Sequence, residues 1–79
     1  EETNEMDNLS IEIGQKLWLL RDELGISLRD AEASTGVSKT TIDQYEKGNV
    51  DQKIGNLKKL ATFYNVDIKW LIGEMEERR

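Results

Sequence analysis

At 79 residues the chain can close one hydrophobic core and no more. It contains neither cysteine nor histidine, which excludes disulfides, thiolate or imidazole metal sites and Cys/His nucleophile pairs. We therefore expect no enzyme, no metal site and no cofactor. No apolar run approaches the roughly 18 residues of a membrane span, so we expect a cytoplasmic protein with no membrane partner.

The net charge of -5 is unfavourable for binding a polyanion, but it comes from the ends of the chain. Residues 1–10 hold four acidic residues and no basic one, whereas residues 11–73 hold nine of each. The folded part is neutral, which permits a basic face and predicts weak, salt-sensitive binding to nucleic acid. Because the chain begins with Glu rather than Met, we expect a piece of a longer protein. We divide it into a flexible acidic N-terminal segment, one domain and a charged C-terminal tail or start of a linker, at 1–9, 10–73 and 74–79.

Apolar residues recur at helical spacing through nearly the whole chain, and proline is absent, so we predict an all-α fold. Ser10 offers the N-cap of a first helix, expected from about Ile11 to Leu24. Gly25 is expected to end this helix. Its inner stripe is expected to consist of Ile13, Leu17, Leu20 and Leu24.

Two short helices joined by a tight corner are predicted next. Ser27, with Asp30 three residues later, begins the first in a capping-box pattern. Ser38 caps the second, which we expect over residues 39–47, and Val37 fills the corner. The residues expected to face the core are Leu28, Ala31 and Thr35 in the first of these helices and Ile42 and Tyr45 in the second. Gly36 and Gly48 are expected to end the two helices.

The clearest amphipathic segment follows a polar loop and predicts a fourth helix. Asn65 can take the left-handed conformation that ends it, and Asp67 can cap a short fifth helix. The expected inner residues of the fourth helix are Ile54, Leu57, Leu60, Ala61 and Tyr64. Those of the fifth are Ile68, Trp70, Leu71 and Ile72.

Two short helices joined by a turn of three or four residues that contains glycine have the spacing of a helix-turn-helix. The residues match as well: Arg21, Ser27, the Thr35-Gly36-Val37-Ser38 corner, Ile42, the Tyr45-Glu46-Lys47-Gly48 stop, Leu60-Ala61, and the Asn65-Val66-Asp67 entry to Trp70-Leu71. With these, residues 11–73 resemble the phage repressor and Cro-like (XRE-type) helix-turn-helix family. The resemblance implies a compact bundle of five short helices like the lambda repressor DNA-binding domain. It also implies a sequence-specific regulator of transcription, a repressor, encoded by a bacterium or phage.

The resemblance places the helix at 39–47 in the major groove of double-stranded DNA. Lys39, Thr40 and Gln44 match the positions that contact bases, and their side chains suit guanine, the thymine methyl and adenine. We expect Asp43 to face solvent or to disfavour wrong sequences. Phosphate contacts are expected from the amides at the start of the second helix and from Ser38, Lys47, Asn49, Lys53 and Arg29.

The resemblance also implies an ion pair and a mode of assembly. Arg21 would pair with Glu46 and tie the first helix to the end of the third, a structural role. Trp70 and Ile72 would support a homodimer or else belong to the core. A dimer predicts a near-palindromic operator with half-sites about one helical turn apart.

Some residues depart from the family pattern. Leu28 replaces a glutamine that touches a phosphate, and Glu32 stands where alanine is common. Trp18 and Leu19 lie about 140° and 240° from Ile13 around the first helix, well off its inner stripe. They favour a second hypothesis, a protein-interaction module or antirepressor-like regulator that binds a protein partner through this surface. Alternatively, Met6 and Leu9 fold back over the Trp18 side chain.

Overall fold

Five helices form in residues 5–78, the part of the chain that the computed structural model describes. No strand occurs among these residues, so the predicted all-α class is confirmed. The helices are α1 (Glu5–Leu24), α2 (Leu28–Thr35), α3 (Lys39–Lys47), α4 (Ile54–Tyr64) and α5 (Ile68–Leu71). Within the same described residues, no helix has the length and apolar character needed to cross a membrane.

Side-chain caps fix the helix boundaries where the sequence predicts them. At the start of α2 the Ser27 hydroxyl accepts a hydrogen bond from the Asp30 amide (3.0 Å), and the Asp30 carboxylate accepts one from the Ser27 amide (3.2 Å). The Asp67 carboxylate accepts a hydrogen bond from the Lys69 amide (2.8 Å) at the start of α5. Asn65 ends α4 with φ of 61°, in the left-handed region that an asparagine tolerates. These predicted boundaries are therefore confirmed.

The predicted start of α1 is wrong. The helix begins at Glu5 rather than about Ile11, so Ser10 lies inside it and is not its N-cap. Residues 5–9 include the strong helix formers Glu5 and Leu9, and acidic residues are favourable at the amino end of a helix dipole. The segment predicted to be flexible, residues 1–9, is therefore helical from Glu5 onward. Residues 1–4 and the Met6 side chain lie outside what the structure describes.

The core gathers apolar side chains from all five helices, including the predicted Ile13, Ile42 and Leu60. Two expected core residues are exposed instead: Leu24 is 55% exposed and Ile54 is 53% exposed. Each stands at the terminal residue of its helix, where the helical stripe runs past the edge of the bundle. The buried residues are Ile13, Leu17, Leu20, Ala31, Val37, Ile42, Tyr45, Leu57, Leu60, Ala61, Tyr64 and Leu71.

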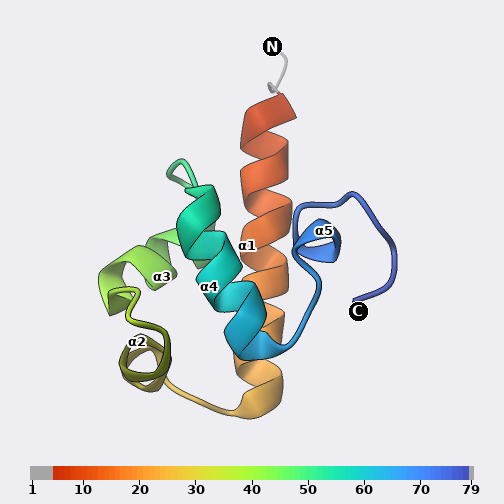
Figure 1. Cartoon of the computed structure of the whole chain (residues 1–79). Helices are drawn as coiled ribbons and strands as arrows, with labels where there is room; N and C mark the ends of the chain where they lie inside the picture. The colour runs from red at the N-terminus through yellow and green to blue at the C-terminus, as the bar shows by residue number, and fades with distance from the viewer. Residues whose placement is uncertain (1–4, 79) are drawn as a thin grey trace.

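Figure 1 shows how the helices surround α1, with α2 and α3 on one side and α5 with the C-terminal residues on the other. The C-terminal residues pack back onto the fold rather than leaving it at Glu74. The Arg78 guanidinium donates to the Glu23 carboxylate (2.8 Å) and lies 5.2 Å from the centre of the Trp70 ring. Lys16 lies 4.8 Å from the same ring and donates to the Trp70 carbonyl (2.6 Å).

A glycine allows α1 to approach the carboxyl end of α3 closely. A Cβ atom on Gly14 would lie 2.4 Å from the Tyr45 carbonyl oxygen and 2.6 Å from that of Glu46. Both obstacles are backbone atoms, which cannot move aside as the end of a flexible side chain can. The contact therefore requires glycine at this position of α1.

We predict that Gly14→Ala lowers the free energy of unfolding by about 2 to 3 kcal/mol, because the added methyl group overpacks the α1–α3 contact. Gly55→Ala is the matched control: it also lies in a helix, and a Cβ there meets nothing within 4 Å. Since alanine is the better helix former, this control should raise stability by up to about 0.5 kcal/mol. Urea unfolding followed by circular dichroism measures both, and equal effects would contradict the close approach.

Candidate nucleic-acid interface

The outer face of α3 holds the side chains predicted to contact bases. Ile42 is buried, and Thr40 and Gln44 each lie about 160° from it around the helix, at two residues' distance on either side. Thr40, Gln44 and Lys39 are all exposed. The structure therefore brings the three predicted residues together on a free surface of one helix. Whether they contact bases stays a prediction.

Two side chains, from Ser38 and Glu32, accept hydrogen bonds from backbone amides at the amino end of α3. The Ser38 hydroxyl accepts a hydrogen bond from the Thr41 amide (3.1 Å) and also bonds to the Thr41 hydroxyl (2.9 Å). The Glu32 carboxylate, from α2, accepts a hydrogen bond from the Lys39 amide (2.9 Å). Ser38, predicted to contact a phosphate, thus has its hydroxyl engaged in the cap of α3.

At the start of α2, the predicted phosphate contact through backbone amides meets an occupied site. The Ser27 and Asp30 amides already bond to the capping-box side chains, and Asp30 adds a negative charge there. A phosphate at this position would compete with a carboxylate of the protein. Arg29, next to it, is exposed and remains available for a phosphate contact.

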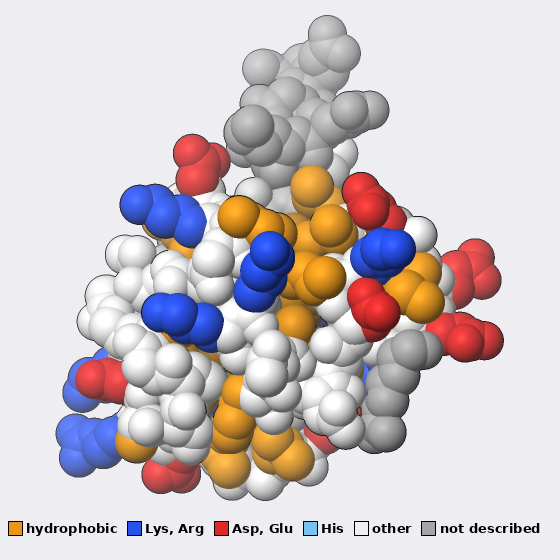
Figure 2. Space-filling view, in the orientation of Figure 1, with side chains coloured by type: hydrophobic (Ala, Val, Ile, Leu, Met, Phe, Trp, Pro, Cys, Tyr) orange, Lys and Arg blue, Asp and Glu red, His pale blue; other side chains and the backbone are white. Residues whose placement is uncertain are grey.

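The other predicted phosphate-contacting residues lie around the carboxyl end of α3. Lys47 forms an exposed ion pair with Asp43, one turn earlier on α3, at 3.0 Å. Asn49 and Lys53 are exposed in the connection from α3 to α4. On the face seen in Figure 2, lysine and arginine side chains are more frequent over α2, α3 and α4, and acidic side chains over α5 and the C-terminal residues.

The structure contains the ion pair between Arg21 and Glu46. Arg21 Nε lies 2.7 Å from one carboxylate oxygen of Glu46, and Nη2 donates to the other at 2.9 Å. The side chains are only 18% and 5% exposed, and the hydrogen bond to Glu46 raises the pKa of Arg21 above its ordinary value. Arg21 also donates to the Ile26 carbonyl (3.0 Å). This geometry joins α1, the turn to α2, and the end of α3.

Tyr45 and Gln52 form a second link that the sequence analysis did not find. The Tyr45 hydroxyl accepts hydrogen bonds from the Lys53 amide (2.9 Å) and from Asn56 Nδ2 (3.1 Å). Gln52 Nε2 donates to the Tyr45 carbonyl (3.0 Å) and to the Ser10 carbonyl (2.9 Å). The polar loop after α3 is thereby fixed to α1 and α4. The sequence contains one signal for this link, because the hydroxyl of a buried tyrosine such as Tyr45 needs a hydrogen-bond partner.

The predicted partner surface on α1 is exposed. Trp18 is 50% exposed and Leu19 is 41% exposed, and Ile11, two turns before Trp18, is 43% exposed. The alternative in which Leu9 folds back over Trp18 is wrong, because both residues belong to one continuous helix, α1. Met6 belongs to the same helix, but its side chain is outside the described part.

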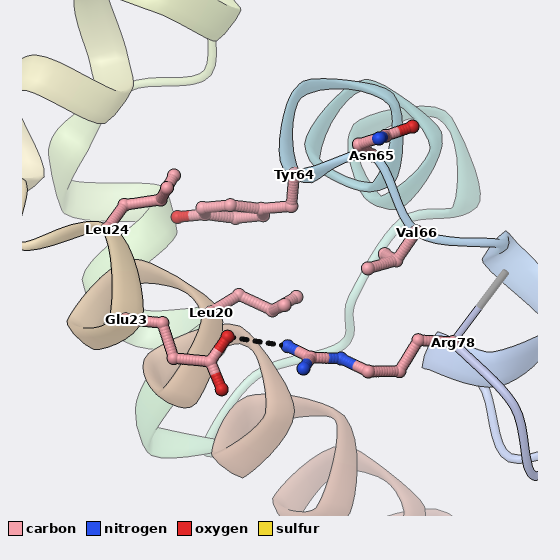
Figure 3. Close-up of a pocket in the computed structure, with 7 residues that line it drawn as sticks. All are labelled: Leu20, Glu23, Leu24, Tyr64, Asn65, Val66 and Arg78. Carbon is pink, nitrogen blue, oxygen red and sulfur yellow. Dashed lines mark hydrogen bonds and ion pairs between the residues drawn. The ribbon is translucent and has the colours of Figure 1, made fainter.

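A cavity of about 240 Å³ lies between the carboxyl ends of α1 and α4 and Arg78. In Figure 3 the Tyr64 ring forms one wall, the Glu23–Arg78 ion pair forms the opposite wall, and Leu20 lies between them. Among the described residues the Tyr64 hydroxyl has no hydrogen-bond partner. Burial raises the pKa of Tyr64 to about 12, so its phenol is neutral at physiological pH. Among the residues described, no cluster of three or more acidic side chains suited to a metal ion occurs here or elsewhere.

Comparison with known proteins identifies relatives of the domain. The helix-turn-helix family model matches residues 19–71. The cryptic phage CTXphi transcriptional repressor RstR of Vibrio cholerae is 37% identical over 61 residues, which make up 77% of this chain and 55% of the relative. The chain therefore spans about half the length of this relative. No solved structure matches the chain.

Loss of the hydroxyl is expected to have different effects at the two tyrosines of the core. Tyr45→Phe leaves the Lys53 amide and the Asn56 side chain without their acceptor, so we expect a loss of about 1 to 2 kcal/mol in the free energy of unfolding. Tyr64→Phe removes a hydroxyl with no partner, so the free energy should change by less than about 0.5 kcal/mol. Urea unfolding at pH 7 compares the two, and a larger loss for Tyr64→Phe would contradict the hydrogen bonding described.

The same Tyr64 variant has a pH signature. The pKa of Tyr64 in the folded protein is raised to about 12 from the ordinary value of about 10, because burial disfavours the phenolate. The neutral phenol is therefore favoured in the folded state over the unfolded state. Its contribution to the free energy of unfolding is fully present below about pH 10 and is lost as the pH rises toward 12. Tyr64→Phe should remove this part of the alkaline destabilisation.

We predict that Arg21→Ala lowers the free energy of unfolding by about 3 kcal/mol, because it leaves the buried Glu46 carboxylate without its charged partner. Asp43→Asn is the control, since it breaks an ion pair whose side chains are 63% and 39% exposed. Such exposed pairs contribute about 0.3 to 0.5 kcal/mol. Thermal unfolding at matched salt separates the two variants, and equal losses would show that the Arg21–Glu46 pair is not important for stability.

Proposed function

The chain belongs to the XRE-type helix-turn-helix family, and on this basis we propose that it is a sequence-specific regulator of transcription that inserts α3 into the major groove of double-stranded DNA. One observation supports this most directly. Lys39, Thr40 and Gln44 are all exposed on α3, and Thr40 and Gln44 lie on the side opposite the buried Ile42. Their side chains can donate to guanine, bridge adenine and contact a thymine methyl.

The supports of α3 favour the same function, because base contacts require a helix held in one orientation. The amino end is capped by Ser38 and Glu32, and the carboxyl end is tied to α1 by the Arg21–Glu46 ion pair. Lys53 and Arg29 are exposed and suited to flanking phosphates, which position the helix without specifying the sequence. We assign no catalytic role to the domain.

We further propose that the protein acts as a repressor, on a palindromic operator, as a homodimer in the cytoplasm of a bacterium. The similarity to a phage transcriptional repressor favours repression. A two-fold dimer would place two copies of α3 in successive major grooves, about one helical turn apart. Trp70 and Ile72 are both half-buried, and we propose that their exposed parts contact a second copy.

A second candidate function is binding to a protein partner through α1. The exposure of Trp18 and Leu19 favours it, since a half-exposed tryptophan on a small domain is suited to an interface. The two functions are compatible, because α1 presents these residues on a surface that does not include the outer face of α3.

Selection from a randomised duplex pool tests the proposal. We expect a palindrome to be enriched, and Lys39→Ala and Gln44→Ala each to weaken binding by about 1 to 3 kcal/mol and to relax the preference at one position. Lys69→Ala on α5 is the control for loss of a positive charge and should leave the selected sequence unchanged. Enrichment of no sequence, even at low salt, would overturn the proposal and direct attention to partners of Trp18.

A further inference from the structure

We propose that Glu32 is a specificity-determining residue: its carboxylate fixes the amino end of α3 and, by its charge, opposes binding through phosphates alone. The inference rests on the proposed function. It assigns a role to a residue at which the family commonly has alanine.

The position of Glu32 is set by a hydrogen bond between helices. Its carboxylate oxygen accepts from the Lys39 amide at 2.9 Å, so a negative charge of α2 lies at the first residue of α3. Lys39 is itself a predicted base-contacting residue. The charge therefore lies at the end of the helix that enters the groove first.

An uncapped amino end of a helix attracts anions, because its free amides and its dipole both favour negative charge. Here Glu32 and Ser38 occupy amides at the start of α3, and the capping box of Ser27 and Asp30 does so at the start of α2. At each helix start, two amides that could otherwise bond to a phosphate of any sequence are thus already bonded to side chains of the protein, and two of these side chains are carboxylates.

A third carboxylate reduces the remaining positive charge. Asp43 lies between Lys39 and Lys47 on one flank of α3, one turn from each, and pairs with Lys47 at 3.0 Å. Electrostatic attraction to the DNA backbone is consequently low on this flank. Binding then depends more on base contacts by Thr40, Gln44 and Lys39, which raises the ratio of specific to non-specific affinity.

The test measures binding of the full chain to a duplex of random sequence and to the enriched site, over a series of salt concentrations. Glu32→Gln keeps an oxygen that can accept from the Lys39 amide but removes the charge. Glu12→Gln is the matched control: Glu12 is exposed on α1 and lies about 200° around the helix from Gly14, which faces α3. It removes the same charge on the side away from α3.

We expect Glu32→Gln to bind the random duplex about three- to tenfold more tightly at low salt, with a smaller gain as salt screens the repulsion. Binding to the enriched site should gain less, so the specificity ratio falls. Glu12→Gln should resemble the parent. Glu32→Ala should bind the random duplex more tightly as well, but with lower stability because the Lys39 amide loses its acceptor.

Equal affinity of Glu32→Gln and Glu12→Gln for the random duplex would overturn the inference, whether or not the unmodified chain enriches a sequence. If the unmodified chain enriches a site but the two variants bind the random duplex equally, the proposed function stands and the proposed role of Glu32 is wrong. If no variant binds any duplex, both fail.

Discussion

The contact between α1 and the carboxyl end of α3 is the constraint on which the candidate interface depends. α3 has nine residues and buries only Ile42 and Tyr45, too little to hold a fixed orientation alone. Gly14 lets the two backbones meet, and the Arg21–Glu46 pair fastens them beside that point. Base contacts need an outer face that does not rotate, and this contact supplies that condition from the opposite side of the helix.

Local chemistry explains why much of this could be predicted from the sequence. A cap bonds to an amide two or three residues away, so Ser27, Ser38 and Asp67 reveal their helices without knowledge of the fold. Features that depend on packing could not be predicted in this way. The exposure of Leu24 depends on where the bundle ends, and the packing of Arg78 on Trp70 depends on the path of the chain after α5. The need for Gly14 follows only from the crossing of α1 and α3.

The candidate site shows the same division. The side chains on the outer face of α3 follow from helical spacing, and the predicted Lys39, Thr40 and Gln44 are indeed exposed. Sequence could not show which of their neighbours are already occupied. The Glu32 contact with the Lys39 amide joins residues on two helices, and its existence depends on the angle at the corner. Tyr45 was expected only to fill the core, yet it also anchors the loop that carries Lys53.

The packing of the last residues has a practical consequence for fusion proteins. Arg78 is held against Trp70 and Glu23. Figure 1 shows the C-terminal residues on the side of α1 opposite α2 and α3. A fluorescent protein or affinity tag joined to the C-terminal end would start from this side, so a short linker would suffice to keep it clear of a duplex on the proposed DNA-binding face of α3. Attachment through the α3–α4 connection would instead place the added mass beside Asn49, where a phosphate contact is predicted.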